Sequence, residues 1–108
     1  MPEWHRVARA DEIREGEGRA FAVAGRVIAL FRDGGSVYAI DDTCPHAGAS
    51  LAQGSLVCGT VVCSWHGWRF NLRDGSWADY SKLKIGAYAV RVLADAIEVE
   101  LPETPGPA

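Results

Sequence analysis

The stretch C-P-H at residues 44–46, followed after sixteen intervening residues by C-S-W-H at residues 63–66, decides how this chain of 108 residues is organised. The two stretches contain two of the three cysteines and two of the three histidines. Each half offers one soft thiolate and one imidazole, which are ligands for a transition metal rather than for calcium or magnesium. The candidate ligands are Cys44, His46, Cys63 and His66.

Two kinds of metal centre use such a ligand set. Two cysteines and two histidines hold one tetrahedral zinc ion in many small modules, where the metal stabilises a non-redox binding domain. The same four residues also suit a [2Fe–2S] cluster in which two imidazoles replace two thiolates on one iron. Zinc modules more often use C-x2–4-C and H-x3–5-H pairs, and C-x-H is not among their usual spacings. The spacing therefore favours the iron–sulfur cluster.

Composition limits the fold and the partners. With 48% apolar residues, 108 residues suffice for one domain with its own core, whereas twelve glycines and five prolines favour an all-β fold with many tight turns. A net charge of −3 without a basic cluster argues against nucleic acid as a partner. No apolar run is long enough to span a bilayer, and the charged start is not typical of a secretory signal. We therefore expect a cytoplasmic protein with no membrane partner.

Alternating and apolar runs predict strands joined by short turns. One run, 26–31, is almost entirely apolar and is expected to be buried on both faces, and a turn of helix capped by Asp11 is expected before it. The segment 41–59 shows no sustained period and reads as an irregular, functional stretch. We expect one domain over 1–101 and a flexible tail over 102–108. Strands are expected near residues 4–8, 20–23, 26–31, 36–40, 61–62, 68–72, 76–77, 88–92 and 97–101, with a turn at 24–25 between the second and the third of them.

The alternation is cleanest in the last two strands. Tyr88, Val90 and Val92 are expected to share one face. In the run 97–101 the three apolar residues are expected to point inward and the two glutamates between them to face water.

The stretches Cys44–Gly48 and Cys63–Phe70 closely resemble the two cluster-binding loops of Rieske proteins, and the resemblance extends over roughly 27–101. It implies an antiparallel Rieske-type β-sandwich or small barrel with a two-loop tip that binds one [2Fe–2S] cluster. It also implies that Cys44 and Cys63 bind the inner iron through sulfur. His46 and His66 would bind the outer, more exposed iron through nitrogen.

Four positions distinguish this chain from high-potential Rieske proteins. Those proteins carry a disulfide between the two loops, where this chain has Ala49 and Trp65. They also place serine and tyrosine hydroxyls beside the cluster sulfurs, where this chain has Trp68 and Phe70. Hydrogen bonds to cluster sulfurs stabilise the reduced state, so their absence lowers the reduction potential. The resemblance therefore implies a soluble protein of the low-potential type.

The second loop, C-S-W-H-G-W-R-F, also looks like the Rieske domain of ring-hydroxylating oxygenases. Those enzymes need a second, mononuclear iron site with two histidines and a carboxylate, and here only His5 would be left for it. We therefore expect an electron carrier rather than an enzyme. It most resembles the stand-alone ferredoxins that pass an electron from a flavin-dependent NAD(P)H reductase to a terminal oxygenase. The alternative is the small Rieske-like subunit of an NAD(P)H-dependent nitrite reductase, with the large subunit as partner.

Four further residues carry expectations of their own. Free cysteines are usually buried, so Cys58 is expected in the core as a small apolar side chain. His5 lies among polar neighbours and is expected at the surface. Trp65 lies inside a ligand loop and is expected to shield the metal centre from water, and Trp68 either does the same or belongs to the core.

The missing hydroxyls lead to a first prediction about the reduction potential. We expect the wild-type midpoint in the lower part of the Rieske range of roughly −150 to +300 mV. Phe70→Tyr, alone and together with Trp68→Ser, should raise it, because each restored hydrogen bond favours the reduced cluster. A difference of 1.4 kcal/mol corresponds to about 59 mV for one electron, so two bonds give a shift on the order of 100 mV.

Voltammetry at neutral pH measures this shift. A wild-type midpoint near the top of the range would contradict the low-potential assignment. A low wild-type value that neither variant raises would show that the hydroxyls do not set the potential.

Overall fold

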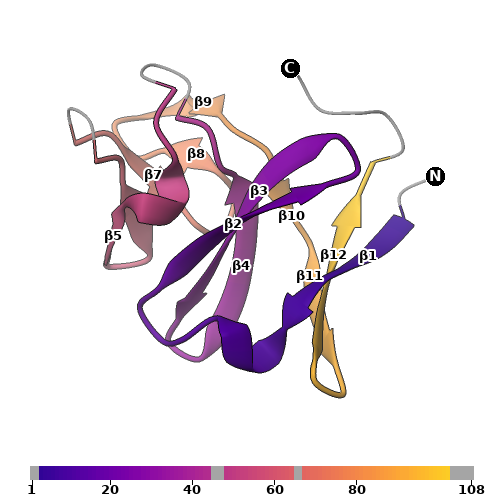
Figure 1. The fold of residues 1–108 in the computed structure, drawn as a ribbon. Helices are drawn as coiled ribbons and strands as arrows, with labels where there is room; N and C mark the ends of the chain where they lie inside the picture. Colours follow the sequence, from indigo (N-terminus) through magenta and orange to yellow (C-terminus); the bar gives the residue numbers. More distant parts are fainter. Residues whose placement is uncertain (1–2, 45–47, 65–66, 103–108) are drawn as a thin grey trace.

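Three antiparallel sheets make up the computed structural model, which describes residues 3–44, 48–64 and 67–102 (Figure 1). The first sheet has the order β1-β12-β11, the second β10-β4-β3-β2 and the third β5-β6-β7-β8-β9. The prediction of an all-β antiparallel fold is confirmed. The elements are β1 (Glu3–Arg9), η1 (Ala10–Glu12), β2 (Gly18–Val23), β3 (Arg26–Asp33), β4 (Ser36–Asp41), η2 (Leu51–Gln53), β5 (Ser55–Val57), β6 (Thr60–Val62), β7 (Arg69–Asn71), β8 (Ser76–Trp77), β9 (Tyr80–Lys84), β10 (Ala87–Tyr88), β11 (Val90–Leu93) and β12 (Ala96–Leu101).

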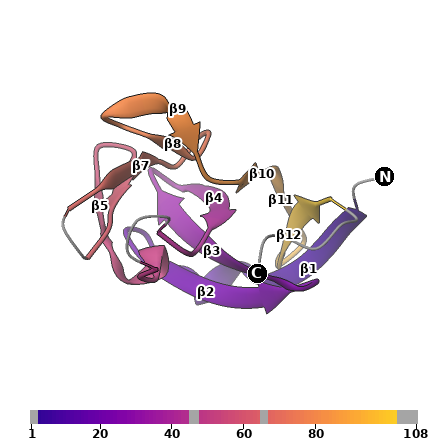
Figure 2. The same ribbon diagram turned by 90° about the horizontal axis from the view of Figure 1, so that it is seen from above.

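Strand β3 lies between two apolar cores because the second sheet lies between the other two (Figure 2). Side chains of a strand alternate between its faces. Accordingly, Ile28 and Leu30 pack with β12 in one core, whereas Ala29 and Phe31 pack with residues of the third sheet in the other. All four are fully buried, which confirms the expectation for most of this apolar run. Val27 is the exception, since it is 48% exposed close to the turn that precedes β3.

The core beside β12 joins the two ends of the described chain. β1 pairs antiparallel with β12, so that Glu3 lies opposite Leu101. In β12 the three alternating apolar residues are fully buried and the two glutamates between them are partly exposed, as predicted. Tyr88, Val90 and Val92 were expected to share one face, yet Val92 is 47% exposed whereas Tyr88 and Val90 pack against this core. Val92 lies on the edge strand β11 near the turn to β12, beyond the part of the core that covers Val90.

Two local expectations were wrong. The segment 41–59 is more regular than its pattern indicated, because η2 and β5 lie within it and β5 pairs with β6. These elements have three residues each, which is too short for a period to show in the sequence. The turn of helix near Asp11 is the 3-10 helix η1, which begins at Ala10, and no side chain caps its N-terminus. The predicted domain over 1–101 with a tail stays a prediction, and residues 103–108 lie outside the described residues.

The predicted turn between β2 and β3 is present and generates a stability prediction. Ala24 and Gly25 both have positive φ, 52° and 80°, as a two-residue hairpin turn of type I′ requires. An alanine in this left-handed region costs roughly 1–2 kcal/mol, whereas asparagine tolerates it. Ala24→Asn should therefore raise the free energy of unfolding by about 0.5–1 kcal/mol in denaturant titrations. Ala22→Asn, at an exposed position of β2, is the matched control, and equal stabilisation by both changes would contradict this explanation.

Candidate metal centre

The loop that carries Cys44 follows β4 and is closed by backbone hydrogen bonds. Thr43 and Ser50 form an isolated antiparallel bridge. Inside it the amide of Cys44 donates to the carbonyl of Ala49 at 2.9 Å, and the amide of Gly48 donates to the carbonyl of Cys44 at 2.8 Å. The Cys44 side chain is fully buried. These contacts fix the thiol in the core while the chain around it turns back on itself.

The loop that carries Cys63 connects β6 to β7. The amide of Cys63 donates to the carbonyl of Trp68 at 2.6 Å. This hydrogen bond closes the loop where the pairing between β6 and β7 ends. Cys63 is 1% exposed. Gly48 and Gly67, one in each loop, have φ of 70° and 73°, a conformation that favours glycine. Figure 1 shows the described flanks of both loops at the same end of the molecule.

Both thiols reach the same core. Cys44 and Cys63 pack in one cluster with side chains of η2 and of the third sheet, among them Leu51 and Phe70, and neither cysteine forms a disulfide. The fold therefore brings together two soft donors from separate loops in an apolar setting. This arrangement fits an iron–sulfur centre. His46 and His66, the other two predicted ligands, and Trp65 lie outside the described residues.

Aromatic side chains pack beside the second loop. Trp68 stacks face to face on Trp77 of β8, with ring centroids 3.9 Å apart and an interplanar angle of 9°. It also lies 6.4 Å from the ring of Phe70, which is fully buried. Trp68 is thus part of the layer that covers the core containing both cysteines. Phe70 brings no hydroxyl into that core, as the sequence predicted.

The expectation for Cys58 was wrong. Cys58 is exposed rather than buried, because it lies in the turn between β5 and β6 with a φ of 48°. There it lines a cavity of about 310 Å³ together with Tyr38 and Arg73. His5, which was expected at the surface, is partly exposed on the edge strand β1, opposite Val99 of β12.

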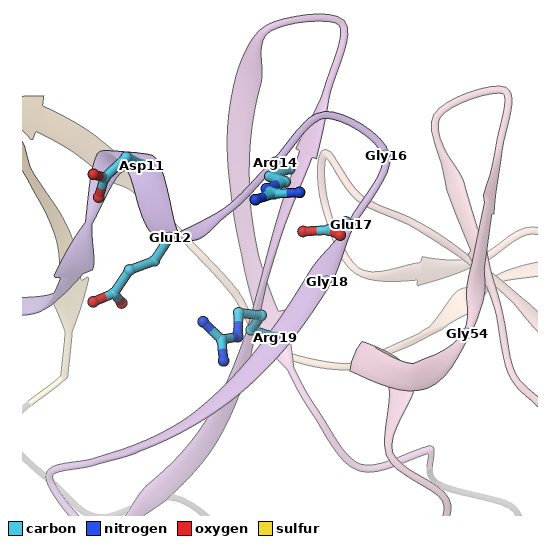
Figure 3. Close-up of a pocket in the computed structure, with 8 residues that line it drawn as sticks. All are labelled: Asp11, Glu12, Arg14, Gly16, Glu17, Gly18, Arg19 and Gly54. Atoms are coloured by element: carbon cyan, nitrogen blue, oxygen red, sulfur yellow. The ribbon is translucent and has the colours of Figure 1, made fainter.

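Figure 3 shows the residues around a second cavity, of about 550 Å³, and none of them belongs to the loops that carry Cys44 and Cys63. The cavity lies between the segment from η1 to β2 and Gly54, and the side chains around it are charged. None of its lining residues is a cysteine or a histidine, so its chemistry differs from that of the candidate metal centre. The residues that line it are Asp11, Glu12, Arg14, Gly16, Glu17, Gly18, Arg19 and Gly54.

A partly buried polar cluster connects β10 to the end of β4, three residues before Cys44. The hydroxyl of Tyr88 donates to Asp41 Oδ1 at 2.5 Å and accepts from the guanidinium of Arg26 at 2.8 Å. The amide of Gly86 donates to Asp41 Oδ2 at 2.7 Å. Burial, followed by the hydrogen bond to Asp41, raises the pKa of Tyr88 to about 12. Sequence reasoning missed this cluster, because its members are far apart in the chain and form no local motif.

Comparison with known proteins identifies the family. A family model described as Rieske [2Fe-2S] domain matches residues 3–89. The anthranilate 1,2-dioxygenase ferredoxin subunit of Burkholderia cepacia is 30% identical over 103 residues, which cover 94% of each chain.

Solved structures with similar folds include two of nearly the same length. The ferredoxin of carbazole 1,9a-dioxygenase from Nocardioides aromaticivorans IC177 is 36% identical with a TM-score of 0.81, covering 92% of this chain and 96% of its own. A protein described as the NADH-dependent nitrite reductase small subunit of Mycobacterium tuberculosis is 26% identical with a TM-score of 0.87, covering 94% and 97%. A complex of reduced oxygenase and oxidized ferredoxin in carbazole 1,9a-dioxygenase also matches, at 31% identity and a TM-score of 0.80, covering 90% and 92%.

The chain spans only 13–21% of the length of several longer curated relatives, which are oxygenases and a desaturase. Among the described residues, no helix has the length and apolar character that crossing a membrane requires.

The raised pKa of Tyr88 generates a prediction about pH. A pKa that folding raises above its ordinary value of 10 contributes stability that is fully present below pH 10 and is lost as the pH rises through about 12. Tyr88→Phe should lower the free energy of unfolding at pH 8 by about 1–3 kcal/mol, because it removes hydrogen bonds to Asp41 and Arg26. The variant should also lose less stability than the wild type between pH 10 and pH 12.

Denaturant titrations across this pH range compare the two proteins. Tyr80→Phe, at a site that is 54% exposed, is the control and should follow the wild-type profile. A Tyr88→Phe profile parallel to that of the wild type would show that Tyr88 does not cause the loss.

Proposed function

Since the chain belongs to the Rieske [2Fe-2S] domain family, we propose that it works as a ferredoxin that carries one electron from a reductase to a terminal oxygenase. The family defines the cofactor as a Rieske [2Fe–2S] cluster. The observation that supports a carrier most strongly is the match to a dioxygenase ferredoxin subunit over 94% of both chains. The cluster supplies one-electron redox chemistry, so the tasks of the chain are to hold it, exclude water and present it to a partner.

For the ligands we propose Cys44 and Cys63 on one iron and His46 and His66 on the other. The two buried cysteines support this assignment, because they come from separate loops and lie in one core. Two thiolates and two neutral imidazoles contribute a ligand charge of −2, compared with −4 for four thiolates. This ligand set accepts an additional electron more readily than four cysteines would.

The surroundings of the cysteines support a potential in the lower part of the Rieske range. Phe70 is fully buried in the same core and has no hydroxyl to donate to sulfur. Ala49 and Trp65 stand at the two positions where high-potential Rieske proteins have cysteines, so the disulfide of those proteins cannot form here. Because both cysteines are buried, water does not reach their thiols in place of the missing hydroxyl donors.

The proposed acceptor is the terminal oxygenase of a ring-hydroxylating dioxygenase system. A matching structure is a complex of reduced oxygenase and oxidized ferredoxin, which supports this kind of partner for a carrier of this fold. The proposed donor is a flavin-dependent NAD(P)H reductase, and this part of the proposal rests on the sequence resemblance. The expected cytoplasmic location stays a prediction.

A second function is favoured by one specific observation. The structure described as the small subunit of an NADH-dependent nitrite reductase matches with a TM-score of 0.87, and the match covers 97% of that subunit. In that case the partner is the large subunit, and the chain still carries an electron. Sequence identity favours the ferredoxin function, since it is 36% for the carbazole dioxygenase ferredoxin and 26% for the nitrite reductase subunit.

The proposal predicts the content of the purified protein. We expect a reddish-brown protein with about two iron and two acid-labile sulfides per chain. Cys44→Ser and Cys63→Ser should abolish the visible spectrum, whereas Cys58→Ser, at an exposed turn, is the matched control and should retain it. A colourless protein with stoichiometric zinc after anaerobic preparation would overturn the function, and loss of the spectrum in Cys58→Ser alone would overturn the ligand assignment.

Electron transfer distinguishes the two partners. The dithionite-reduced protein should be reoxidised faster by an oxidised carbazole dioxygenase terminal oxygenase than by a nitrite reductase large subunit, as followed by stopped-flow absorbance. The reverse order would favour the nitrite reductase function.

A further inference from the structure

We propose that Asp42 is a positioning residue that sets the relative placement of the two cysteine loops and thereby the environment of the cluster. The inference rests on the proposed function, because it concerns the loops that carry the proposed ligands. Asp42 directly follows β4 and precedes Cys44 by two residues. Among the residues that the structure describes, it is the only charged residue that is buried, with 6% of its surface exposed.

The contacts of Asp42 close the base of the first loop. Its Oδ1 accepts a hydrogen bond from Ser50 Oγ at 2.8 Å and another from the amide of Ala52 at 3.0 Å. Its carbonyl accepts from the amide of Leu51 at 2.6 Å, and its own amide donates to the carbonyl of Val27 in β3 at 3.2 Å. Asp42 therefore ties three consecutive residues beyond the loop to the strand that lies at the centre of the fold.

The same contacts reach the second loop through η2. The amide of Gly54 donates to the carbonyl of Leu51 at 2.9 Å. A Cβ at Gly54 would lie 2.1 Å from the carbonyl oxygen of Val62, so the two backbones are packed with no room for a side chain. Val62 immediately precedes Cys63. A displacement of the segment that Asp42 holds is therefore transmitted to the backbone beside the second cysteine.

Burying the Asp42 carboxylate costs free energy unless hydrogen bonds compensate for its lost hydration. A buried carboxylate loses its hydration and needs donors or a cation in return. In the described part of the chain, Asp42 has two donors to its carboxylate and no salt bridge to a basic side chain. Asp42 therefore contributes to the site through the position of Oδ1, which accepts hydrogen bonds from the Ser50 hydroxyl and the Ala52 amide at the same time.

Four variants of the cluster-loaded protein separate this role from a general effect on folding. Asp42→Ala removes the acceptor, and Asp42→Asn retains an oxygen at its place. Ser50→Ala removes one of the two donors. Gly54→Ala leaves Asp42 intact and forces apart the backbones of Gly54 and Val62.

A chemically matched control lies elsewhere in the chain. Asp74 accepts from Ser76 Oγ at 2.7 Å and from the Ser76 amide at 3.0 Å through one carboxylate oxygen, in a turn outside both cysteine loops. Asp74→Ala therefore removes the same kind of contact pair. We expect it to change thermal stability and to leave the properties of the cluster at their wild-type values.

Three measurements report on the cluster rather than on the fold. They are the g values of the reduced protein by electron paramagnetic resonance, the midpoint potential by voltammetry, and the rate at which the visible spectrum is lost in air. Asp42→Ala should shift the g values and the midpoint and lose the spectrum roughly tenfold faster, as expected for two lost hydrogen bonds. Asp42→Asn should stay within about twofold of the wild-type rate. Ser50→Ala should lie between the two, and Gly54→Ala should shift the g values.

Each alternative outcome has a definite meaning. Wild-type g values and a wild-type rate of loss in Asp42→Ala would overturn the inference. An Asp42→Asn variant as impaired as Asp42→Ala would also overturn it, because charge rather than acceptor geometry would then matter. Should Asp42→Ala yield no cluster-loaded protein, wild-type g values in both Ser50→Ala and Gly54→Ala would overturn it instead. A wild-type protein without any cluster would refute the proposed function, which is a different result.

Discussion

The structure depends on one constraint: two thiols nineteen positions apart in the chain must lie in one apolar core. Neither loop can achieve this alone. Cys44 is held by the loop that follows β4, and Cys63 by the connection between β6 and β7. The third sheet packs against the second and closes the core around both side chains. The candidate metal centre is therefore built where two sheets meet, rather than on a single hairpin.

The double burial of β3 makes this possible. A strand with apolar side chains on both faces allows the fold to separate a structural core from the core that holds the cysteines. The structural core joins β1 and β12 to the second sheet, so the strands at both ends of the described chain stabilise the scaffold. The cysteine core lies on the other face of β3, next to the loops. The loops can thus carry ligands while the scaffold retains its own packing.

Two adjacent carboxylates at the end of β4 link the scaffold to the first ligand loop. Asp41 binds Tyr88 and Gly86 at the end of β4, and Asp42, the next residue, binds the segment beyond the first loop. Successive side chains along an extended chain point to opposite sides, which is how adjacent carboxylates come to serve two different contacts. The end of β4 is therefore anchored on both sides just before the chain enters the ligand loop. Hydrogen bonds of this kind hold the ligand-bearing loops of a metal centre in a fixed position.

Local pattern determined much of this protein. The paired C-x-H and C-x-x-H motifs indicated the metal centre and the family, the apolar run in β3 indicated its burial, and the alternation in β12 indicated which side chains point inward. Only the tertiary structure decided the rest, because those features depend on residues distant in sequence. The exposure of Cys58 follows from the turn between β5 and β6, two strands too short to show a period. The contacts of Asp42 and Asp41 join residues eight to forty-seven positions away, so their physical role exists only once the chain has folded.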